Sequence, residues 1–139
     1  MPGIDESLLE AMRLPGARGA SVVDWISGLA LGTVGDAPGG DPEATAAETA
    51  ELARLATESG ALAPGALAPA AGAPGGPSRK EPPVQDLIIT TADSYHLLRF
   101  VTTTFDSTVF LHLWLDRADG NLALARIRLA ELADRLVLG

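Results

Sequence analysis

Three apolar runs near the end of the chain decide the fold: DLIIT at Asp86–Thr90, YHLLRFV at Tyr95–Val101 and TVFLHLWLD at Thr108–Asp116. The first run is short and rich in β-branched residues, and the other two are apolar on both faces. Turn-forming residues such as Asp119-Gly120-Asn121 bound them, which is typical of strands. Strands that are apolar on both faces belong to a sheet covered on both sides, so we expect helices above and below it.

The last strand leads into a predicted closing helix. Asn121 is a favourable N-cap residue, and leucine and alanine recur after it at the spacing of one buried helical stripe. This stripe contains Leu122, Ala125, Leu129, Leu132 and Leu136, and we expect Leu124 and Ile127 to widen it.

The N-terminal part predicts one short helix followed by a hairpin. Ile4–Leu14 has leucines at helical spacing, and Pro15-Gly16 ends the helix. Gly19–Val23 and Leu29–Leu31 then read as two strands joined by the turn Asp24–Gly28.

Trp25 lies in the predicted turn of this hairpin, where a tryptophan is unusual. Two interpretations compete. The ring folds back onto the core, as most tryptophans are largely buried, or it projects as a contact residue for a partner, because tryptophan is a preferred interface anchor.

The middle of the chain predicts a second helix, from Asp41 to about Ser59. Asp41 is the cap, Pro42 occupies the first helical position, and Gly60 follows the end. Alanine fills most of its apolar positions, so this face can pack closely on the sheet or on a copy of itself. Its glutamates are interpreted as a solvated face, with recruitment of a basic partner as the alternative.

The segment from Gly60 to Pro83 is rich in proline, glycine and alanine. Such a composition breaks helices and strands and offers little to bury. We therefore predict a single domain over residues 1–139 with a flexible insertion at about 60–83.

Composition limits the classes of partner and compartment. The chain has 139 residues, a formal net charge of −8 and no cysteine. The acidic balance disfavours nucleic acid and anionic membranes, and disulfides and thiolate chemistry are excluded. The N-terminus lacks the basic and apolar regions of a signal peptide, so a cytoplasmic protein is expected.

No catalytic motif is present. The sequence has no phosphate-binding G-x-x-x-x-G-K-[ST] loop and no nucleophile elbow. If the loop between their strands is centred on Thr104, His96 and His112 lie opposite each other and could bind a metal with Asp86 or Asp116, whereas a one-residue shift separates them. Structural histidines are the favoured interpretation. We expect no enzyme activity, metal or cofactor.

The predicted order of helix, hairpin, helix, three-stranded meander and helix resembles the roadblock/dynein-light-chain family, whose prokaryotic members include regulators of small Ras-like GTPases. The matching residues follow the family order over about two thirds of the chain. They are Leu14-Pro15-Gly16-Ala17-Arg18-Gly19-Ala20, Val22-Val23-Asp24, Gly28-Leu29-Ala30-Leu31, Leu87-Ile88-Ile89 and Asp119-Gly120-Asn121-Leu122-Ala123-Leu124.

The resemblance implies an α+β, profilin-like fold: a five-stranded antiparallel sheet with the first and last helices on one face and the middle helix on the other. It also implies a homodimer in which the middle helices and the third strands meet. The residues predicted for this interface are Ala47, Ala50, Arg54, Leu87 and Ile89, and Trp25 is the candidate contact for another partner.

The function implied is that of a non-catalytic, dimeric regulatory module that binds a small Ras-like GTPase, or another signalling protein, and modulates the nucleotide cycle or location of the GTPase. One alternative is a structural adaptor that works without nucleotide. A second is a small-molecule sensor with a pocket lined by Tyr95, His96 and Trp114. The bias towards alanine, glycine and arginine indicates a high-GC genome, and an actinobacterium is expected as the source.

Overall fold

The computed structural model describes residues 3–59, 61, 84–101 and 108–136. Apart from residue 61, the predicted insertion at about 60–83 therefore lies outside the described residues. The elements follow in the order α1 (Ile4–Ala11), β1 (Ala17–Asp24), β2 (Leu29–Gly35), the 3-10 turn η1 (Pro38–Gly40), α2 (Pro42–Glu58), β3 (Asp86–Thr90), β4 (Ser94–Val101), β5 (Val109–Asp116) and α4 (Leu122–Arg135).

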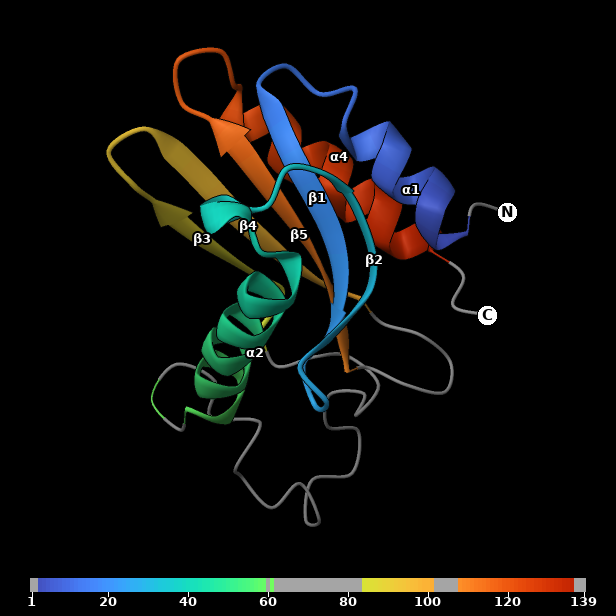
Figure 1. Ribbon diagram of the computed structural model, residues 1–139, viewed down its shortest axis with the longest axis vertical. Coiled ribbons are helices and arrows are strands. Elements are labelled where there is room, and N and C mark those ends of the chain that lie inside the picture. Colours follow the sequence, from blue (N-terminus) through green and yellow to red (C-terminus); the bar gives the residue numbers. More distant parts are fainter. Residues whose placement is uncertain (1–2, 60, 62–83, 102–107, 137–139) are drawn as a thin grey trace, which may run out of the picture.

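The strands form one sheet of five, in the order β2-β1-β5-β4-β3, and every neighbouring pair is antiparallel. Helices α1 and α4 lie side by side on one face, and α2 crosses the other (Figure 1). The predicted fold class and the placement of the three helices are confirmed.

The sheet separates two apolar cores. The larger lies under α1 and α4 and the smaller lies under α2, which explains why β4 and β5 are apolar on both faces. The larger core is centred on Leu8, Val22, Leu97, Leu111, Leu113, Leu115 and Leu129. The smaller consists of Val23, Ala46, Ala50, Ala53, Leu98, Phe100 and Phe110.

Side-chain caps start the two longer helices where the sequence predicts. The carboxylate of Asp41 accepts hydrogen bonds from the backbone N–H groups of Glu43 and Ala44, at 3.0 and 3.3 Å. The Asn121 side chain accepts from Leu124 N–H at 3.0 Å. These bonds satisfy donors that have no partner within the helix.

The two largest differences from the predicted boundaries are in α1 and β2. α1 ends at Ala11, and β2 continues to Gly35, well beyond Leu31. Glycine is depleted in strands, but Gly32 is needed here, because a Cβ at this position would come within 2.6 Å of Ile4 Cγ2 on α1. Gly32 therefore lowers the strand propensity of this segment, and the same residue leaves room for α1 to approach β2.

The buried stripe of the closing helix, α4, is narrower than predicted. Leu129 and Leu132 are buried, whereas Ile127 is 61% exposed and does not widen the stripe.

The turn before α4 is in tight contact with the turn after α1. Gly16 has φ +79° there, and a Cβ on it would lie 2.6 Å from Gly120 N. This contact places the start of α4 beside the end of α1.

Candidate self-association and docking surface

Helix α2 has one face of small residues on the sheet and one face with leucines directed to solvent. The inward face contains four buried alanines, of which Ala50 and Ala53 have no exposed surface. On the outward face Leu52 is 39% exposed and Leu55 is 72% exposed. Large apolar side chains exposed on one helix face mark a surface that a partner can cover.

A groove runs between this outward face and strand β3. Its volume is about 610 Å³. Leu52 and Leu55 contribute from α2 and Leu87 from β3, and the other lining residues are Glu51, Arg54, Ala56, Glu58 and Ser59. The groove therefore has an apolar centre with charged side chains around it.

Strand β3 is the end of the sheet on this side, because within the part of the chain that the structure describes it pairs with β4 alone. Leu87 and Ile89 are both partly buried, and Leu87 packs against the core beneath α2. The strand is tied to α4 through Asp86, which accepts from Arg126 Nε at 2.7 Å and lies 3.7 Å from Arg99 Nη1. The hydrogen bond to Asp86 raises the pKa of Arg126.

The structure places the predicted interface residues differently. Ala47 is exposed on the outward face of α2, Arg54 is partly buried at its side, and Leu87 and Ile89 lie at the sheet edge. Ala50 faces the opposite way: it is fully buried against the sheet, so its side chain cannot reach a second copy. The structure thus places Ala50 in the core beneath α2, and an interface through the other four residues stays a prediction.

Trp25 and Arg54 hold the turn after β1 against α2. The Trp25 ring is partly buried and meets Phe100 edge-on, with centroids 6.5 Å apart and planes at 86°. Arg54 Nη1 donates to the carbonyl oxygen of Trp25 at 2.7 Å, and the same guanidinium bonds to Glu51. Trp25 thus packs on the core, and its role as a partner contact stays a prediction.

The two histidines are diagonal neighbours on the α2 face of the sheet. His96 pairs with Trp114 and His112 with Leu98, so neither of the two registers considered from the sequence occurs. His96 Nδ1 lies 3.1 Å from His112 Nε2. Burial, reinforced by the neighbouring His96, lowers the pKa of His112 to about 3, and burial also lowers the pKa of His96.

This histidine pair is part of a series of stacked planar side chains. The His96 ring is parallel to Trp114 within 5°, and the Arg18 guanidinium lies 3.9 Å from the centre of the Trp114 ring. Within the described residues no group of three or more metal-ligating side chains gathers at any point. The geometry of the pair is that of one hydrogen bond between two neutral imidazoles.

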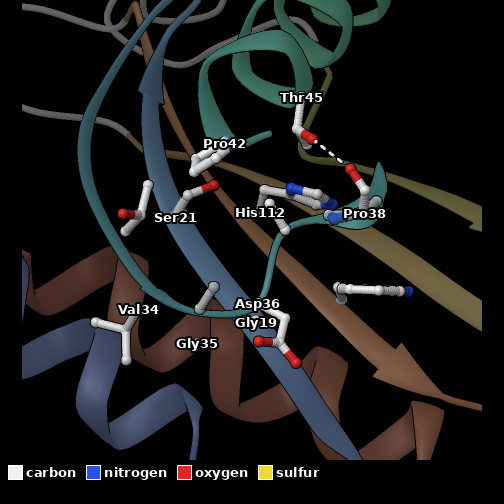
Figure 2. A pocket seen from close by; sticks show the side chains of 13 residues that line it. Gly19, Ser21, Val34, Gly35, Asp36, Pro38, Pro42, Thr45 and His112 are labelled. Atoms are coloured by element: carbon white, nitrogen blue, oxygen red, sulfur yellow. Dashed lines mark hydrogen bonds between the residues drawn. The ribbon is translucent and has the colours of Figure 1, made fainter. Parts of the chain in front are cut away.

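A small cavity lies beside His112, between β1, β2 and the start of α2 (Figure 2). The Thr45 hydroxyl closes one side by donating to the Pro38 carbonyl at 3.0 Å. The cavity measures about 20 Å³, which is room for about one water molecule. It is lined by His112 and Trp114 but not by Tyr95 or His96, so the predicted sensor pocket is not formed there.

Sequence comparisons give no match, neither to a family model nor to a curated protein. In the described part of the chain no helix is long and apolar enough to cross a membrane.

Solved structures match over nearly the whole chain. Myxococcus xanthus MglB is similar with a TM-score of 0.71 and 18% identity, covering 94% of this chain and 82% of that one. The gliding protein MglB of Thermus thermophilus gives 0.68 and 20%, covering 94% and 83%. A Roadblock/LC7 domain from Streptomyces avermitilis gives 0.65 and 16%, covering 95% and 92%. From its sheet order, helix placement and these likenesses, the chain has the fold of the roadblock proteins.

Proposed function

We propose that this protein is a non-catalytic, dimeric regulatory module that binds a small Ras-like GTPase and modulates its nucleotide cycle or its location. The observation that carries the proposal is the exposed leucine face of α2 beside the open edge of β3. A second copy placed there would cover Leu52 and Leu55 and pair β3 with its counterpart, which joins two sheets into one.

The comparisons support the same proposal. The fold is shared with MglB structures, one of which is described as having a tetrameric arrangement, and this supports an oligomeric state for the chain. The sequence resemblance adds the GTPase, because the prokaryotic roadblock proteins include GTPase regulators. Recognition would use surface contacts with the switch loops, whose order depends on the γ-phosphate.

Nucleotide dependence is the test of the GTPase partner. The immobilised protein is incubated with lysate of its own organism containing either GDP or a non-hydrolysable GTP analogue. We expect a Ras-like GTPase to be recovered in one nucleotide state only. Recovery of the same proteins in both states would overturn the proposal and leave an adaptor that works without nucleotide.

A matched pair of variants links that recovery to the proposed surface. Leu55→Ala removes the most exposed leucine of α2, and Ile127→Ala removes a similarly exposed side chain from α4 on the opposite face. We expect only the first variant to weaken recovery of the GTPase. Equal recovery by both variants would show that GTPase binding does not depend on the α2 surface proposed for self-association.

A further inference from the structure

Strand β2 forms the second open edge of the sheet, far from β3. Among the described residues it pairs with β1 alone, and alternate residues are exposed from Leu29 to Gly35. Leu29 is 64% exposed and Leu31 is 46% exposed. Proteins usually protect such an edge with charged residues or proline, but the seven residues of β2, LALGTVG, contain neither.

The backbone of this edge is available for pairing. A bulge between Val22 and Val23 displaces the first part of β2, and regular pairing with β1 resumes at Gly32. Asp36 N–H donates to Arg18 O at 2.9 Å, so the alternation of an antiparallel ladder turns the N–H and C=O of Thr33 away from β1. An added strand would find a donor and an acceptor at Thr33.

A second groove lies beside the β2 edge, and its lining residues determine which partner can bind there. It measures about 360 Å³ and is lined by residues 28–33 together with Glu43 from the first turn of α2. Glu43 is the one charged residue among its described lining residues. Asp24 pairs with Leu29 at the start of the strand and Asp36 follows its end, so acidic residues lie at both ends of the apolar edge as well as in the groove.

These charges decide between two kinds of occupant. In an antiparallel pair of two β2 strands, Asp36 at the end of each strand would lie near the start of the other, where that copy has Asp24 and Glu43, and like charges oppose such pairing. An extended segment that alternates apolar residues with lysine or arginine would place apolar side chains on Leu29 and Leu31 and basic side chains near the carboxylates.

We propose that the β2 edge is a docking site at which a partner protein adds a basic, alternately apolar strand to the sheet. The site is separate from the proposed self-association surface, which uses α2 and β3. Both can be occupied together, because β2 and β3 are the opposite ends of the sheet.

A fluorescent peptide that repeats lysine and valine four times serves as the probe, with binding measured by anisotropy. Thr33→Pro removes the outward N–H, and proline is tolerated at such an edge position. We expect this variant to bind the peptide about three- to tenfold more weakly, the range for one lost hydrogen bond. The same peptide with alternate backbone nitrogens methylated keeps its charge and should not bind.

A second pair of variants tests the charge independently of the backbone. Glu43→Lys changes the groove beside β2, and Glu48→Lys makes the same change further along α2, at an exposed residue that lines neither this groove nor the groove beside β3. We expect weaker binding from the first only. Equal binding of the methylated peptide, or equal effects of the two lysine variants, would overturn the proposal. Self-association that is lost in Thr33→Pro would also overturn it, by assigning the edge to a second copy.

Discussion

Leu55 offers a direct measure of the proposed self-association. Its side chain is 72% exposed in one copy, and complete burial of a leucine stabilises by about 1.5–3 kcal/mol. Burial of the exposed share would contribute about 1–2 kcal/mol in each copy, and a symmetric interface counts it twice. Alanine keeps the Cβ, so we expect Leu55→Ala to weaken the dimer by about 2 kcal/mol, roughly 30-fold in its dissociation constant.

Sedimentation velocity over a series of protein concentrations measures this constant directly. Ile127→Ala is the control, because Ile127 is 61% exposed but lies on α4, on the opposite face of the sheet. Both substitutions should leave the free energy of unfolding of the monomer nearly unchanged, since exposed side chains contribute little to it. An unchanged dissociation constant for Leu55→Ala, or an equal change for Ile127→Ala, would refute the reasoning.

Three further outcomes are expected. His112 has a pKa of about 3 when folded and near 6.5 when unfolded, so the unfolded state binds more protons between these values. Stability is full above pH 6.5 and falls as the pH is lowered towards 3; urea unfolding at several pH values should show this slope, and His112→Leu should reduce it. Gly16→Ala should destabilise more than Gly39→Ala in thermal unfolding, because both have positive φ but only Gly16 has a backbone, that of Gly120, against its missing Cβ. Asp41→Ala removes the cap of α2 and should cost about 1 kcal/mol in chemical unfolding, whereas an unchanged value would show that the cap contributes nothing.

Local chemistry made several elements predictable. β3 has the predicted bounds, Asp86–Thr90, because its β-branched run has a turn signal after it. Asp41 and Asn121 begin their helices as expected, since an N-cap depends on one side chain and the adjacent backbone. In each case the cause lies within a few residues of its effect.

Features that depend on packing could not be read from the sequence in the same way. Alanine occupies several faces of α2, so periodicity does not tell that Ala50 faces the sheet and Ala47 faces solvent. Thr49 and Thr57 share the buried face although threonine is polar. Their hydroxyls donate to the helix carbonyls of Thr45 and Ala53 at 2.8 Å, which satisfies the donors inside the helix.

The register of β4 against β5 was unpredictable for a related reason. Apolar residues fill both faces of these strands, so a shift of the pairing leaves the hydrophobic pattern almost unchanged. The position of His112 opposite Leu98 is therefore a result of the complete sheet, and the low pKa that follows from its burial could not be inferred before the fold was known.

The central position of β5 has a consequence for how the protein is made. β5 is the last of the five described strands in chain order, yet it is the strand that joins the β1–β2 hairpin to the β3–β4 hairpin. Until residue 116 has left the ribosome, the two hairpins have no strand between them, and an isolated hairpin has little stability in water. The first hairpin therefore stays without its β5 partner until β5 has been synthesised, and closure of the sheet is a late event in the folding of the domain.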